Sequence, residues 1–123
     1  MTLENYKQKV HFVKALLQPQ TMKVQQFYNK NQFIITDGTT IVFQSYDSTI
    51  AQINNGVLVL GEDWDYSKTT LKHLYLFLYY YKNNIDGRQY SEIFHHAGGL
   101  ENSKNKRQFL QNLINKKTIK VTL

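Results

Sequence analysis

The sequence contains no cysteine and a single proline among its 123 residues. Without cysteine there is no disulfide and no thiolate-bound metal, which fits a reducing cellular interior. Long apolar runs are also missing. The most apolar run, residues 74–81, spans eight residues, whereas a membrane-spanning helix needs about 20. No apolar stretch typical of a secretory signal follows Met1. We therefore expect a soluble, cytoplasmic protein with no membrane contact.

Lysine and arginine are absent from residues 37–67, although the whole chain carries a net charge of +6. That block has a net charge of −5, whereas residues 1–36 carry +4 and residues 68–123 carry +7. A basic C-terminal third is compatible with nucleic acid, an anionic surface or an acidic protein partner. The alternative is an ordinary solvated helix face.

The length and the 41% hydrophobic content predict a single domain, residues 1–123, with a modest core. Apolar residues recur at helical spacing from Thr2 to Leu17, and Pro19 limits continuation, so we expect an N-terminal helix. β-branched and aromatic runs then predict strands at 24–28, 33–36, 41–46, 49–53 and 57–60. Asp37-Gly38 and Asn55-Gly56 suit tight hairpin turns, and residues 29–31 form a polar turn. We therefore expect a meander of four or five antiparallel strands.

Ser67 or a nearby threonine can cap a helix that runs to about Tyr81, with Asp63 and Asp65 complementing the positive end of its dipole. Its apolar residues extend around most of its circumference, so we expect it to be the core helix. Residues 83–87 break it. A short helix follows at about 89–96, and a last helix begins at Ser103, with Phe109, Leu110, Leu113 and Ile114 facing inward and Lys104, Arg107 and Gln111 facing outward.

Residues 118–122 alternate as a strand would, although a frayed tail fits equally. The predicted fold class is therefore α+β: a four- or five-stranded antiparallel meander, an N-terminal helix, and about three C-terminal helices packed on one face.

Two segments carry a family resemblance. Phe43 to Ala51 reads F-x-S-Y-x-S-x-I-A, and the segment from Asp63 to Leu74 contains W-D-Y-S-x-T-T-x-K at residues 64–72 and is followed by Phe77-Leu78. Together with Leu58 to Gly61, they resemble a small domain family of mobile elements in Gram-positive bacteria. The resemblance covers residues 32–82 and implies an accessory protein of a phage, plasmid or integrative element, without an activity to transfer. Residues 83–123 would form a basic helical extension.

Three groups could carry chemistry. Glu62, Asp63 and Asp65 could bind a divalent cation as part of a small metal-dependent enzyme, but helix capping explains two of them. His95 and His96 point about 100° apart on a helix, which makes shared metal ligation awkward. His73 could act as a general base with Asp63 or Asp65, but no nucleophile or oxyanion motif accompanies it. We expect no catalytic residues, no metal and no cofactor.

The aromatic and basic residues give the binding hypotheses. Tyr75, Tyr79, Tyr80 and Tyr81 cannot all bury their hydroxyl groups, so some reach the surface, where tyrosine suits an interface or a base-stacking platform. Trp64 fits a hydrophobic plug at one end of the sheet, or else an exposed anchor for a partner. Three cations oppose the dipole at the start of the last helix, an arrangement that an anion would relieve. The candidate binding residues are Lys104, Lys106, Arg107, Lys116, Lys117, Lys120, Tyr79 and Tyr80.

We therefore expect a non-enzymatic accessory protein that binds nucleic acid or a host nucleoprotein. An inhibitor of a host defence system, such as a CRISPR effector, is one concrete form, with a host protein as the target. The alternative is a protein–protein interaction module that acts through the aromatic helix without nucleic acid. Either form could be a monomer or a homodimer.

Overall fold

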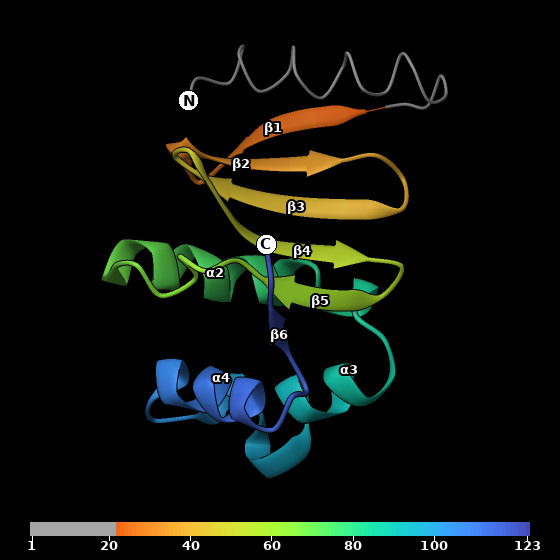
Figure 1. Ribbon diagram of the computed structural model, residues 1–123, viewed down its shortest axis with the longest axis vertical. Helices are drawn as coiled ribbons and strands as arrows, with labels where there is room; N and C mark the ends of the chain where they lie inside the picture. The colour runs from red at the N-terminus through yellow and green to blue at the C-terminus, as the bar shows by residue number, and fades with distance from the viewer. Residues whose placement is uncertain (1–21) are drawn as a thin grey trace.

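The computed structural model describes residues 22–123 (Figure 1). These residues form an α+β fold in which six strands pair in chain order, β1-β2-β3-β4-β5-β6. The first five strands are an antiparallel meander, as predicted: β1 Lys23–Phe27, β2 Asn29–Thr36, β3 Thr40–Ser45, β4 Ser48–Asn54 and β5 Val57–Leu60. The predicted helix at residues 2–17 lies outside the described residues.

The hairpin turns follow the local sequence. Asn55 and Gly56 have φ values of 50° and 84°, and Gly38 has a φ of 95°, so both predicted turns are confirmed. The polar turn predicted at residues 29–31 is wrong, because Tyr28 turns the chain with a φ of 64° and β2 begins directly after it. A register shift between Gln26 and Phe27 makes room for this very tight connection.

Three α-helices follow the meander within residues 22–123: α2 Lys68–Tyr80, α3 Gly87–Phe94 and α4 Lys106–Asn115. Short 3-10 turns connect them at Lys82–Asn84, His96–Gly98 and Leu100–Asn102. The short helix predicted at 89–96 thus starts and ends two residues earlier. No helix in this described part is long and apolar enough to cross a membrane.

Helix α2 carries the core against the sheet. Its fully buried residues are Thr70, His73, Leu74, Phe77 and Leu78, a stripe at the 3.6-residue period. Burial also extends beyond this stripe, as predicted, because other α2 residues are half-buried against the same core: Leu71, Tyr75, Leu76 and Tyr79. The Phe77 ring stacks on Phe43 of β3, with centroids 5.5 Å apart. Trp64, just before the helix, is 4% exposed and belongs to the same core cluster, which confirms the plug.

The last helix begins later than predicted. Asn105, and not Ser103, is its N-cap: the Asn105 side chain accepts a hydrogen bond of 3.0 Å from the Gln108 amide. Ser103 instead ends the preceding 3-10 turn, where its amide donates to the Leu100 carbonyl. Leu110 and Leu113 are buried as predicted, while Phe109 and Ile114 are half-buried against the core.

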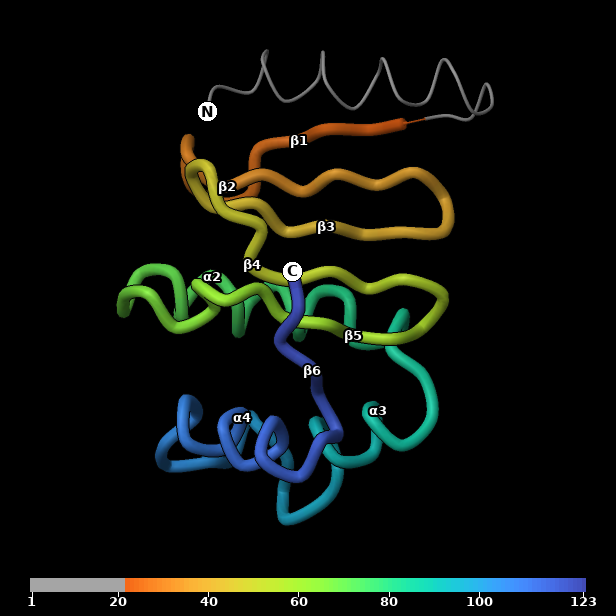
Figure 2. Tube along the Cα trace, in the orientation of Figure 1, coloured from red at the N-terminus to blue at the C-terminus, as the bar shows by residue number. Residues whose placement is uncertain are grey.

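The chain then returns to the sheet, as the path in Figure 2 shows. Strand β6, Lys120–Val121, pairs in parallel with β5 through Val59–Lys120 and Leu60–Val121. The tail is therefore a strand, and the sheet gains one more strand than the predicted maximum of five.

A glutamine extends the β5–β6 pairing. The Gln89 amide on α3 accepts from the Leu58 N–H at 2.7 Å and donates to the Leu58 and Thr118 carbonyls, both at 2.9 Å. One side chain thus pairs the backbone N–H and carbonyl groups that the two-residue β6 is too short to reach along β5.

Candidate functional site

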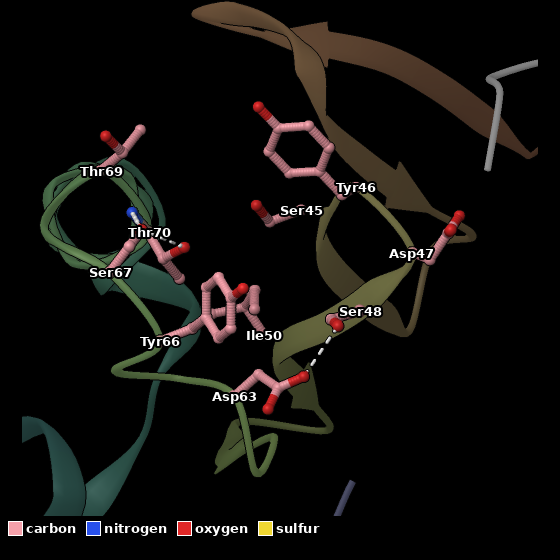
Figure 3. A pocket seen from close by; sticks show the side chains of 10 residues that line it. All are labelled: Ser45, Tyr46, Asp47, Ser48, Ile50, Asp63, Tyr66, Ser67, Thr69 and Thr70. Atoms are coloured by element: carbon pink, nitrogen blue, oxygen red, sulfur yellow. Dashed lines mark hydrogen bonds between the residues drawn. The ribbon is translucent and has the colours of Figure 1, made fainter.

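A cavity of about 540 Å³ opens between the β3–β4 hairpin and the start of α2 (Figure 3). Of its ten described lining residues, seven carry hydroxyl groups, two carry carboxylates and one is aliphatic; none is basic. The lining residues are Ser45, Tyr46, Asp47, Ser48, Ile50, Asp63, Tyr66, Ser67, Thr69 and Thr70. We call this the tyrosine pocket, because Tyr46 and Tyr66 are 59% and 80% exposed beside it.

The hairpin side of the tyrosine pocket is a strained two-residue turn. Tyr46 has a φ of 52°, a left-handed conformation that costs a non-glycine residue roughly 1–2 kcal/mol. Local hydrogen bonds hold it there: its amide donates to the Asn31 carbonyl at 2.8 Å, and its carbonyl accepts from the Gln44 side chain at 3.1 Å. The Gln44 amide oxygen in turn accepts from Thr49 at 3.0 Å. Strain that is held in this way is typical of functional positions.

The helix side of the pocket depends on Gly61 and Ser67. The Gly61 amide donates to the Ile50 carbonyl at 2.8 Å, and a methyl group on Gly61 would overlap the Thr49 carbonyl oxygen. Only glycine therefore lets β5 leave the sheet at this point. Ser67 is the N-cap of α2, as predicted: its hydroxyl accepts from the Thr70 amide at 3.0 Å.

The two predicted capping acids have other partners. The Asp63 carboxylate accepts from the Ser48 hydroxyl at 2.9 Å and so joins the two sides of the tyrosine pocket. Asp65 accepts two hydrogen bonds from Arg107, from Nε at 3.0 Å and from Nη2 at 2.7 Å. The same guanidinium lies 5.7 Å from the centre of the Trp64 ring. Arg107 is exposed on α4, as predicted, and its contacts also fasten α4 to the segment before α2.

Among the described residues, the side chains proposed for metal binding or acid–base chemistry do not form a cluster that would support either hypothesis. Among residues 22–123, no three histidine, aspartate or glutamate side chains gather closely enough to hold a metal. His73 is buried, and its Nδ1–H donates to the Thr69 carbonyl at 2.8 Å, because a carbonyl can only accept. His73 therefore has a structural hydrogen bond within α2.

Half of the six candidate basic residues are engaged within the fold. Besides Arg107, Lys106 donates to the Glu101 and Ser103 carbonyls at 3.2 and 3.4 Å, and Lys116 pairs with Glu92 at 2.9 Å. The side chains of Lys104, Lys117 and Lys120 are exposed and make no hydrogen bond or ion pair with any described residue. At the start of α4, two of the three crowded cations, Lys106 and Arg107, thus have partners within the fold.

Glu92 is the centre of a small polar network. It accepts from the Thr118 hydroxyl at 2.6 Å, from Lys116 and from Arg88 at 3.1 Å. These hydrogen bonds, the one from Thr118 above all, lower the pKa of the Glu92 carboxyl from 4.5 to about 2. The network ties α3 to the segment that leads into β6.

The two candidate tyrosines of α2 differ. Tyr79 packs on Phe94 and is half-buried; its hydroxyl is buried without a described partner, and this burial raises its pKa to about 12. Tyr80 is 65% exposed, with its edge against Phe27 and Tyr81. Tyr80 can meet a partner in this structure; Tyr79 contributes mainly to packing.

Neither Tyr46 nor Tyr66 was among the predicted binding residues. Their spacing gives no signal, because 20 positions separate them in the sequence. The available signal was the pair of motif segments, 43–51 and 63–72: every described residue that lines the tyrosine pocket lies in one of them. Motifs far apart in a chain that meet at one cavity indicate a shared role.

Neither the curated proteins nor the solved structures include a significant match to this chain. A family model matches residues 15–94. That range contains the whole tyrosine pocket, whereas the basic residues from Lys104 to Lys120 lie beyond it. The chain belongs to the family of unknown function DUF8033.

Proposed function

We propose that this protein is a non-enzymatic binding module that holds a polypeptide partner at the tyrosine pocket. The observation that carries the proposal is the exposure of Tyr46 and Tyr66 beside a cavity built wholly from the two motif segments. Tyrosine gives a large, rigid and amphipathic contact at low cost in conformational entropy, and serine hydroxyls provide adaptable hydrogen bonds. The cavity volume lies in the usual range of roughly 300–1,000 Å³ for ligand pockets.

The charge of the pocket favours protein over nucleic acid as the partner there. The described lining has two carboxylates and no cation, so a phosphate backbone would be repelled. Of the basic residues predicted from the sequence, Lys104, Lys117 and Lys120 are the ones that remain open for contact with nucleic acid. A host nucleoprotein would combine both contacts, with its protein component at the pocket and its nucleic acid at the lysines.

The biological setting rests on the resemblance to mobile-element proteins of Gram-positive bacteria. An accessory protein of such an element acts on components of its bacterial host, and inhibition of a host defence complex, such as a CRISPR effector, is one form of that action. The family match names no activity, so this setting guides the choice of lysate in the experiment below.

The test compares two exposed tyrosines. Tagged wild-type protein, Tyr66→Ala and Tyr80→Ala are used to capture partners from a nuclease-treated lysate of a Gram-positive bacterium, with mass spectrometry as the readout. The proposal predicts a defined partner that Tyr66→Ala loses and Tyr80→Ala keeps. Both side chains are largely exposed, so neither change should lower the melting temperature by more than about 2 °C. Loss with Tyr80→Ala alone would instead support the aromatic helix α2 as the binding surface.

Binding of nucleic acid is tested separately by titration of labelled DNA and RNA at two salt concentrations. Purely electrostatic binding weakens steeply with salt and is reduced by the triple change Lys104→Glu, Lys117→Glu and Lys120→Glu. Absence of binding at low salt would leave these lysines as a solvated surface.

A further inference from the structure

We infer that the tyrosine pocket binds a cationic side chain of the partner, arginine above all; this inference rests on the proposed function. The charge pattern of the chain is the first observation. The protein is basic, yet residues 37–67 carry five acids and no lysine or arginine, and eight of the ten described lining residues come from this block. The pocket is thus a negative site in a positive molecule, which attracts cations and repels anions.

Asp63 supplies a carboxylate with unused capacity. In the described part of the chain, it accepts one hydrogen bond, from Ser48, and forms no ion pair. An ionised carboxylate has about four acceptor positions. Lys68 is next to the lining residues in sequence, but it is exposed and does not line the pocket.

The aromatic rings complete the recognition set. In Figure 3, Tyr46 stands on the hairpin side of the opening and Tyr66 on the helix side, close to Asp63. A guanidinium binds favourably on a tyrosine face and donates up to five hydrogen bonds. The fold already contains such an arrangement, since Arg107 pairs with Asp65 over the ring of Trp64. The pocket presents the same chemistry without an internal arginine.

The positive end of the α2 dipole lies at the pocket and opposes the binding of a cation, so its charge must be compared with that of the carboxylates. A helix N-terminus is equivalent to about +0.5 charge. The Asp63 carboxylate alone carries one full negative charge at the pocket and accepts one hydrogen bond, from the neutral Ser48 hydroxyl. This charge is larger than that of the dipole, so a cation is preferred over a phosphate or carboxylate group.

The test uses the folded chain and a matched pair of peptides. Blocked Gly-Gly-Arg-Gly-Gly and its citrulline twin have almost the same shape but differ in charge. Each is titrated to millimolar concentration into ¹⁵N-labelled protein, with NMR shifts read for residues 45–48 and 63–70. We expect the arginine peptide to shift these signals and to bind at least about fivefold more tightly than citrulline, a preference that Asp63→Asn removes. Tyr80→Ala serves as the control and should keep it.

The outcomes separate this inference from the proposed function. Equal binding of both peptides would overturn the inference, because the pocket would then bind peptides without a preference for a cation. The absence of any shift with the arginine peptide, or shifts only with a neutral sugar such as methyl glucoside, would also overturn it, because the pocket would then not bind the cationic peptide at all. The proposed function is decided independently by the Tyr66-dependent capture of a partner. If that capture fails while the arginine peptide binds, the pocket recognises cations but is not the surface that holds a polypeptide partner.

Discussion

Replacement of Gln89 by alanine should destabilise the protein far more than expected for a half-buried glutamine. Its side chain makes three hydrogen bonds, two with the backbone of Leu58 and one with the carbonyl of Thr118. Strand β6 is only two residues long, so no other backbone replaces these partners. The change would free one N–H and two carbonyls next to Leu58, which is fully buried.

The magnitude follows from the number of lost bonds. Each hydrogen bond contributes about 1 kcal/mol net, and a buried group left unpaired costs about 1–3 kcal/mol. Water can reach some of the space that the half-buried Gln89 leaves, and alanine gains a few tenths of a kcal/mol in helix propensity. We expect the free energy of unfolding to fall by about 2–3 kcal/mol, which corresponds to a melting temperature lower by roughly 10 °C.

Urea unfolding followed by circular dichroism measures this loss, and Gln108→Ala is the matched control. Gln108 is also a helical glutamine, but it is exposed, and its side-chain amide donates only to the Asn112 side chain. Its replacement should cost less than about 0.5 kcal/mol. Hydrogen exchange of the Leu58 amide adds a local readout, with faster exchange in Gln89→Ala. If the two variants are equally stable, the view of Gln89 as an extension of the sheet is wrong.

Three further predictions concern contacts that hold the pocket and the helices. Arg107→Ala should lower the free energy of unfolding by about 0.5–1 kcal/mol, and a double-mutant cycle with Asp65→Asn should show coupling; zero coupling would mean that this partly exposed pair contributes nothing. Because the Glu92 pKa is lowered to about 2, its contribution to stability is present above its ordinary pKa of 4.5 and is lost as the pH falls towards 2. Melting curves from pH 5 to pH 2 should therefore fall more steeply for wild type than for Glu92→Gln, and parallel curves would contradict this. Gly61→Ala should destabilise the protein by about 3 kcal/mol in urea unfolding, since the new methyl group meets the backbone carbonyl of Thr49; near-wild-type stability would show that the strand exit adapts.

Local features of the fold could be predicted from the sequence because their causes are local. Asn55-Gly56 turns the chain because these residues tolerate positive φ, and Ser67 caps α2 through a bond to an amide three positions away. The choice of Asn105 over Ser103 as the next cap was not predictable in this way. Both residues are good caps, and the 3-10 turn before Ser103 decides between them.

Contacts between distant segments limited the prediction of the site. From sequence, Arg107 is one of several exposed cations; its pairing with Asp65, 42 positions away, depends on how α4 packs. The tyrosine pocket likewise needs the β3–β4 turn and the start of α2 in one place. The residue types in the motif segments were visible, but only the fold shows that Tyr46 and Tyr66 border the same cavity.

The parallel pairing of β6 with β5 has a consequence for how the chain is made. Lys120 pairs with Val59, 61 positions earlier, so the last edge of the sheet closes only after all three described helices have been synthesised. The antiparallel meander, whose contacts are local, can assemble on the ribosome well before that. During this interval β5 presents an open strand edge, a template for pairing with other nascent chains. Ribosomes that stall within α4 should therefore release aggregation-prone fragments, and the β5 edge is protected only once residues 120–121 have been made.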